Sequence, residues 1–163
     1  MQLTDATDAL SLTRQMIDIP SVSGEEGPLA DAVEAALRGA GFGSVDTLEI
    51  LRDGDAVCAR THLGLPQRVV LAGHLDTVPI AENVPGRLEV RDGVEVVWGR
   101  GSVDMLGGCA AALALACEAG ALIRGGAREA LTADITWIFY DHEEVASHFN
   151  GLGRIQRLYP QWL

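Results

Sequence analysis

Residues 69–79 constrain the fold of this chain more than any other segment. Four apolar residues at 69–72 precede Gly73, and no polar side chain interrupts them. A short strand without a polar face is typical of the interior of an α/β sheet, so we expect a central strand over 68–73 with helices on both faces. His74 and Asp76 follow at the carboxyl end of this strand, where open α/β sheets bind their ligands.

His74 and Asp76 are two positions apart, so in an extended chain their side chains point in the same direction. An imidazole can then bind a metal through one ring nitrogen while a carboxylate accepts a hydrogen bond from the other. A single histidine at a strand end is, however, more often a hydrogen-bonded polar residue than a metal ligand. Further acidic residues are needed before a metal site is favoured.

Two later segments end in acidic residues in the same way. A second apolar strand is predicted over 133–140, and Glu143 and Glu144 follow it. Asp104 lies in a glycine-rich loop just before an alanine-rich helix. If the two strands are parallel, His74, Asp104 and the two glutamates meet at one edge of the sheet.

Each of these acidic residues also has an ordinary explanation. Aspartate is favoured at the start of a helix, so Asp104 can be a helix cap as well as a ligand. Glu143 and Glu144 can form a solvated acidic turn. Two adjacent carboxylates at the end of a buried strand nevertheless repel each other unless a cation or a proton lies between them. A divalent metal would relieve this repulsion.

The remaining segments also fit an α/β fold. Helices are predicted over 5–19, with Thr4 or Asp5 as the cap, over 28–38 and over 109–120. Residues 20–26 are expected to form a solvated loop between the first two helices. Hairpins are predicted over 44–61 and 88–98. No repeat, low-complexity segment or linker marks an internal domain boundary. We therefore expect one domain, a three-layer α/β sandwich with a mostly parallel central sheet.

Composition argues against several functional classes. The 163 residues carry a net charge of −11, so nucleic acids and anionic membranes are unfavourable partners. The three cysteines lack paired metal-binding spacing, and free thiols in a reducing compartment explain them better than disulfides. The N-terminal residues lack a cationic signal segment, and no apolar run reaches the ~18 residues of a membrane span. We therefore expect a cytoplasmic protein.

The three site segments resemble the signature blocks of the co-catalytic di-zinc exopeptidase and deacylase family. These blocks are residues 73–79, 99–105 and 140–145. Family members include aminoacylase, acetylornithine deacetylase, glutamate carboxypeptidase and succinyl-diaminopimelate desuccinylase. Residues 83–87 and 150–154 are most similar to the desuccinylase branch, which removes succinate from N-succinyl-diaminopimelate on the route to lysine.

The resemblance implies a role for each candidate site residue. His74 and Glu144 are each expected to bind one Zn²⁺ ion, and Asp104 is expected to bridge the two ions, with Co²⁺ as an alternative metal. Asp76 is expected to support His74, and Glu143 is expected to be the general base. Two ions ~3.5–4 Å apart activate water for attack on an amide. The family also implies a cis peptide bond directly after the bridging aspartate.

Family members are considerably longer than this chain. Their remaining metal ligands, their lid and their dimer interface follow the third block, whereas this sequence ends at Leu163. We therefore expect residues 1–163 to form part of a catalytic domain, without the lid, that binds zinc weakly and hydrolyses no substrate alone. His142 and His148 are candidate substitute ligands. Full-length members are expected to be homodimers that act on small N-acyl amino acids.

Three alternatives remain open from the sequence. Another deacylase or a carboxypeptidase of the same family would share every site residue named above. The chain could instead be a non-catalytic protein that binds a metal or a partner. It could also aggregate through an exposed apolar surface.

Overall fold

The computed structural model describes residues 3–163. Within these residues the main sheet has four strands, in the order β1 (Leu48–Asp53), β2 (Ala56–Thr61), β6 (Asp134–Tyr140) and β3 (Arg68–His74). β1 and β2 form the first predicted hairpin and β2 pairs antiparallel with β6, whereas β3 and β6 are parallel. The predicted α/β class is confirmed. The sheet is mixed rather than mostly parallel, because the hairpin contributes two antiparallel pairings.

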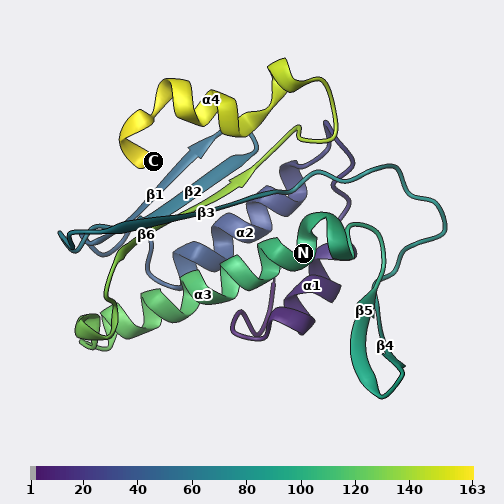
Figure 1. Cartoon of the computed structure of the whole chain (residues 1–163), viewed down its shortest axis with the longest axis horizontal. Helices are drawn as coiled ribbons and strands as arrows, with labels where there is room; N and C mark the ends of the chain where they lie inside the picture. Colours follow the sequence, from purple (N-terminus) through teal and green to yellow (C-terminus); the bar gives the residue numbers. More distant parts are fainter. Residues whose placement is uncertain (1–2) are drawn as a thin grey trace.

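Helices cover both faces of the sheet (Figure 1). In the described part of the chain, three lie on one face and one on the other: α1 (Ala9–Ile17), α2 (Gly27–Gly39) and α3 (Gly107–Arg124), opposite α4 (Gly151–Leu158). Trp137 and Phe139 of β6 pack into the larger core with the three helices. Ile138 faces the other way and joins Ile155 of α4 in a smaller core. This arrangement gives the three layers that were predicted.

β3 lies at the edge of the sheet, and β6 is the strand with a neighbour on each side. The prediction of a central strand over 68–73, covered on both faces, is therefore wrong. Val69 and Val70 are 48% and 40% exposed, and only Gly73 and His74 at the end of β3 are buried. A run of apolar residues indicates that a strand favours burial, but it does not encode which strands lie beside it.

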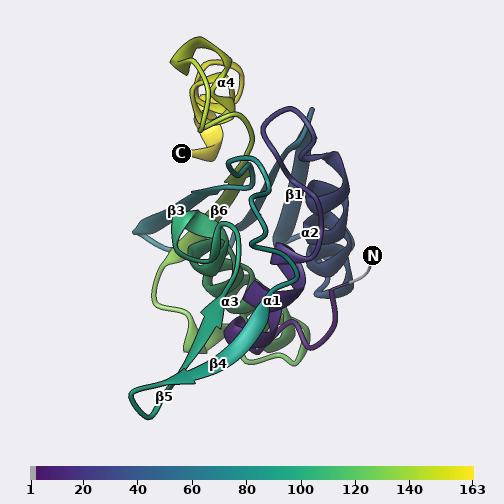
Figure 2. The same ribbon diagram turned by 90° about the vertical axis from the view of Figure 1, so that its right-hand side faces the viewer.

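A second sheet in the described residues consists of β4 (Arg87–Arg91) and β5 (Val94–Trp98), the other predicted hairpin. It projects from the body of the molecule (Figure 2). The Arg87 guanidinium lies 3.9 Å from the centroid of the Trp98 ring, so a cation–π contact joins the two strands. From β5 the chain passes through the short segment Ser102–Leu106 into α3.

α3 is the predicted alanine-rich helix, and it extends further than expected in both directions. The helical run Ser102–Arg124 is long and apolar enough to cross a membrane by length and composition alone. Glu118 interrupts the apolar run of this helix, so no uninterrupted run of ~18 residues marks it in the sequence. Half of the most apolar window is buried inside the protein, where α3 packs on α1, α2, β3 and β6. Such packing is typical of a core helix.

Two helix starts differ from the sequence reading. α1 begins after Asp8, whose carboxylate accepts a 3.1 Å hydrogen bond from the Leu10 N–H. The predicted cap at Thr4 or Asp5 is wrong, because Thr4 instead binds the side chain of Gln15. α4 was not predicted, and the side chain of Asn150 caps its first turn.

Candidate metal centre

The carboxyl ends of β3 and β6 lie side by side because these strands are parallel, with His74 opposite Tyr140. This register brings together His74, Asp104 from the segment before α3, and Glu144 from the loop after β6. One potential ligand atom of each residue lies within 4.8 Å of the others. The three predicted ligand positions therefore meet at one edge of the sheet.

Both ring nitrogens of the buried His74 side chain have polar neighbours. Nδ1 lies 2.9 Å from the backbone oxygen of Asp76 and 3.5 Å from its carboxylate. Nε2 lies 3.1 Å from Oδ1 of Asp104. Burial disfavours the charged ring, but the hydrogen bonds to Asp76 and Asp104 outweigh it and raise the pKa of His74 to about 9. The ring thus lies in a strongly negative environment.

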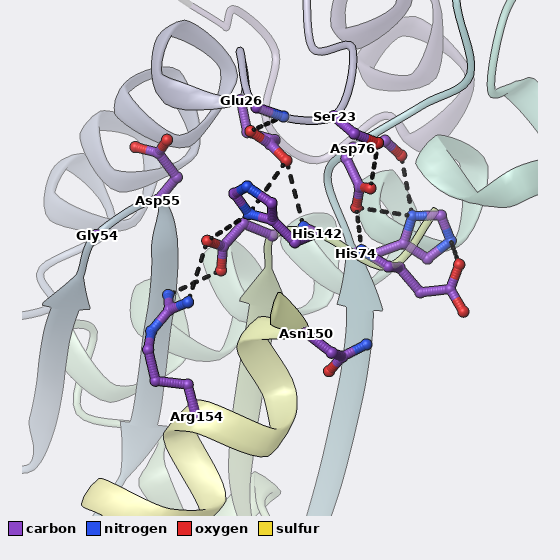
Figure 3. Close-up of polar contacts among 12 residues, drawn as sticks. Ser23, Glu26, Gly54, Asp55, His74, Asp76, His142, Asn150 and Arg154 are labelled. Carbon is purple, nitrogen blue, oxygen red and sulfur yellow. Dashed lines mark hydrogen bonds and ion pairs between the residues drawn. The ribbon is translucent and has the colours of Figure 1, made fainter. Parts of the chain in front are cut away.

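Asp76 is fully buried, and its carboxylate accepts three hydrogen bonds, of which the one from Ser23 is drawn in Figure 3. Ser23 Oγ donates at 2.7 Å, and the backbone N–H groups of Glu143 and Glu144 each donate at 2.9 Å. Burial alone would raise the pKa of this carboxyl, but His74 and the three donors lower its pKa far below the ordinary value. Asp76 therefore stays ionised and joins His74 to the loop after β6. We call residues 141–144 of that loop the acidic loop.

Asp104, Glu143 and Glu144 form the more exposed side of the site. The Asp104 side chain is 76% exposed, and a cis peptide bond joins this residue to Met105, as the resemblance implied. Partial burial and the charge of Asp104 raise the pKa of Glu144 above its ordinary value, as expected for neighbouring carboxylates. Glu143 lies at the rim, with Oε2 4.0 Å from His74 Nε2.

Two side chains of the N-terminal loop belong to the same site and were not predicted. The sequence predicts a solvated loop over 20–26, yet Ser23 binds Asp76 and Glu26 is fully buried. A β-bridge between Val22 and Thr77 holds the loop against the end of β3. The spacing of Ser23 and Glu26 matches a helix capping box, which was the available signal, but both side chains make other contacts.

The two candidate substitute ligands lie outside the group of three. The Nδ1 atom of His142 is 2.9 Å from Oδ2 of Asp141 and 3.6 Å from Oε1 of Glu26. The His148 ring is exposed beside Phe149, with ring centroids 4.0 Å apart. Within residues 3–163, neither ring belongs to the cluster around His74.

Comparison with known proteins shows the family. The model of Peptidase family M20/M25/M40 matches residues 70–158, which is more than half of the chain and contains the five predicted site residues. The chain belongs to this peptidase family. The match confirms the resemblance noted in the sequence and places the chain in a family of enzymes.

Curated relatives point to one branch of the family. The succinyl-diaminopimelate desuccinylase of Corynebacterium glutamicum is 44% identical over 162 residues, and a Mycobacterium tuberculosis relative with the same desuccinylase name is 47% identical over 156 residues. Each match covers 96% of this chain and 39% of the relative. The chain therefore spans well under half the length of the curated relatives that it matches.

Solved structures confirm the fold. The M20 family metallo-carboxypeptidase Sso-CP2 of Sulfolobus solfataricus matches with a TM-score of 0.64 at 14% identity, over 96% of this chain and 35% of that protein. The Bacillus subtilis YXEP protein, described as a dinuclear metal binding peptidase, matches with a TM-score of 0.56 at 18% identity, over 93% of this chain and 39% of that protein. The fold of this chain is shared with part of these two M20 family proteins.

Proposed function

We propose that this chain supplies the metal-binding part of an amide-hydrolase active site that removes succinate from N-succinyl-diaminopimelate. The observation that carries the proposal is the meeting of His74, Asp104 and Glu144 in a chain that is 44–47% identical to desuccinylases. The chemistry of these side chains also supports the proposal, because one imidazole and two carboxylates are suitable ligands for a metal that activates water.

The donor set fits Zn²⁺. One imidazole nitrogen with carboxylate oxygens is a common set for catalytic zinc. The carboxylate of Asp76 beside the other ring nitrogen of His74 matches the usual support of a metal-binding histidine. We assign His74 and Glu144 to one Zn²⁺ each and Asp104 to both ions. When bound, such a pair lowers the pKa of water and polarises the substrate carbonyl.

Proton transfer is assigned to a side chain of this protein, Glu143. Glu143 is exposed at the rim and its backbone is held by Asp76, so its carboxylate can take a proton from the attacking water and return it to the leaving amine. Asp76 keeps the His74 ring oriented with Nε2 toward Asp104. A small N-acyl amino acid is the proposed substrate, and the homodimer and the cytoplasmic location stay predictions.

Metal binding tests the site directly. Titration with Zn²⁺ by isothermal calorimetry should show binding to the unmodified chain, and His74→Ala should weaken it by at least ~100-fold, since even supporting residues change metal affinity 10–100-fold. His148→Ala is the matched control, because that ring is exposed and lies outside the cluster. Equal affinity in the His74→Ala variant would contradict the assignment.

A chimera tests the reaction. This chain would replace the matching segment of the Corynebacterium glutamicum desuccinylase, which restores the length of that relative. Release of succinate from N-succinyl-diaminopimelate should depend on Zn²⁺ and should fall ~10²–10⁴-fold in Glu143→Gln, the usual contribution of a general base. A folded, metal-loaded chimera without turnover would refute the proposed function. The same assay checks the prediction that the 163-residue chain alone turns over no substrate.

A further inference from the structure

Three consecutive backbone N–H groups after β6 donate to two buried carboxylates. The His142 N–H lies 3.2 Å from Oε1 of Glu26, and the N–H groups of Glu143 and Glu144 each lie 2.9 Å from Asp76. His142 has a φ of +61°, a left-handed conformation that helps successive N–H groups point to one side. We call the carboxylates of Glu26 and Asp76 the clamp (Figure 3).

Glu26 is an unusual half of this clamp. It is fully buried and precedes α2, but its side chain does not cap that helix. Oε2 instead accepts a 2.8 Å hydrogen bond from the Gly24 N–H, while Oε1 accepts from His142. Within residues 3–163 its ion-pair partner is the His142 ring, 3.6 Å away. Because a buried carboxylate is costly unless it is hydrogen-bonded, these backbone contacts hold the side chain in place.

The loop that carries Glu26 is also tied to Asp76. Ser23 Oγ donates to the Asp76 carboxylate at 2.7 Å, and the Thr77 N–H donates to the Ser21 carbonyl at 2.9 Å. The Ser23 N–H donates in turn to the Thr77 carbonyl at 3.3 Å. Residues 21–26 therefore join the start of α2 to the acidic loop and to the end of β3, so both halves of the clamp are tied to the same segment.

The start of the acidic loop has a separate anchor. Arg154 of α4 donates to the carboxylate of Asp141 at 2.8 and 3.2 Å (Figure 3). That contact holds a side chain one residue before the turn, whereas the clamp holds the backbone from which Glu143 and Glu144 project. The His142 ring lies between the two anchors, with Nδ1 2.9 Å from the Asp141 carboxylate and 3.6 Å from that of Glu26.

We propose that Glu26 is a positioning residue for the metal centre. By fixing the backbone at His142, it sets the direction in which Glu144 presents its carboxylate to His74 and Asp104. The inference rests on the proposed function, because it takes Glu144 as a metal ligand. Removal of this acceptor leaves the His142 N–H without its buried partner, and the loop relaxes away from the cluster.

Glu26→Gln tests the role, with Glu25→Gln as the matched control. Glutamine has one acceptor oxygen for the two N–H donors of Gly24 and His142, so its amide group faces one of them and that hydrogen bond is lost. Co²⁺ is the probe, because its visible absorption reports ligand geometry as well as binding. We expect Glu26→Gln to bind Co²⁺ 10–100-fold more weakly, with an altered spectrum, as is typical for supporting residues. Glu25 is exposed, and its variant should match the unmodified chain.

A purely structural effect is distinguished by a variant that destabilises the protein elsewhere. Gly120→Ala acts on the contact between α3 and Ala40, away from the loop, and should keep the Co²⁺ affinity and spectrum of the unmodified chain. If Glu26→Gln keeps them as well, the inference is overturned and the metal centre stands. If the unmodified chain binds no Co²⁺ or Zn²⁺, the proposed function fails and the inference fails with it.

Amide hydrogen exchange on the unmodified, metal-free chain keeps the inference testable even if Glu26→Gln does not fold. The amides of His142, Glu143 and Glu144 should exchange slowly before any metal is added, because the clamp already holds them. Exchange at the rate of an unstructured loop would overturn the positioning role.

Discussion

At the scale of single residues, each end of the sheet has a buried carboxylate that accepts hydrogen bonds from several backbone N–H groups. At the start of β6, Asp134 accepts hydrogen bonds from Thr61 Oγ1 and the Leu63 N–H at 2.8 Å and from the Leu65 N–H at 3.0 Å. Burial alone would raise the pKa of Asp134, but these donors lower it. Asp76 does the same at the other end, where the loop that it organises carries the site.

Asp134→Asn should destabilise the fold by about 1–3 kcal/mol at neutral pH, because the new amide group faces an N–H donor and leaves it unsatisfied. The folded pKa of Asp134 is lower than the unfolded value of ~3.9, so its stabilisation is present above that pH and is lost as the pH falls through the folded pKa. Urea unfolding at pH 7 and pH 3 checks this. The difference between the variant and the unmodified chain should shrink in acid, and a difference independent of pH would count against it.

At the scale of elements, close approach between helices depends on single glycines. Gly120 of α3 lies against Ala40, the residue directly after α2, and a Cβ added to Gly120 would lie 2.5 Å from the Ala40 carbonyl oxygen. Backbone cannot move aside as a flexible side chain can. Gly39, the last residue of α2, has no atom within 4 Å of such a Cβ and no positive φ. Alanine substitutions at these two positions therefore distinguish the effect of packing on stability from the effect of backbone entropy.

Gly120→Ala and Gly39→Ala should change stability in opposite directions. The first forces α3 away from Ala40 and should cost about 1–3 kcal/mol, as overpacking does. The second removes conformational freedom from the unfolded chain and should stabilise by about 0.4–1 kcal/mol. Thermal unfolding of both variants checks this pair, and a gain of stability in Gly120→Ala would show that the close contact does not exist.

At the scale of the whole molecule, the three cysteines are distributed between the two hydrophobic cores. Cys109 and Cys117 belong to the larger core and Cys58 to the smaller one, and all three are buried free thiols, as predicted. Burial raises the pKa of Cys58 and Cys109 to about 12 and that of Cys117 to about 11. Because the thiolate is the reactive form, each thiol becomes reactive only when its core opens.

Labelling with a thiol reagent at pH 8 should therefore be slow for all three cysteines in the folded chain and rapid in urea. The rate should follow the free energy of unfolding across the Gly39 and Gly120 variants. Mass spectrometry after limited labelling assigns the sites. Rapid modification of Cys58 alone, in native conditions, would indicate that the α4 layer opens independently of the larger core.

His74, Asp104 and Glu144 meet because β3 and β6 pair in parallel, which the tertiary structure decided. The sequence alone determined the α/β class, both hairpins and the placement of these three residues where strands and loops end. These features follow from local periodicity and from residues placed where strands and loops end, and such signals lie within a few neighbouring positions. The three signature blocks were also sufficient to identify the family. Local pattern is thus sufficient where one segment specifies its own conformation.

Only the tertiary structure decided the position of β3 at the sheet edge, the mixed sheet and the part played by residues 21–26. The contact between Glu26 and the His142 N–H joins residues 116 positions apart, and Ser23 reaches Asp76 across 53. Neither side chain has a periodic or spacing signal for these partners, because the contact exists only after β3, β6 and α2 have packed. The geometry of the acidic loop is therefore a property of the whole fold, whereas its residues are a property of the sequence.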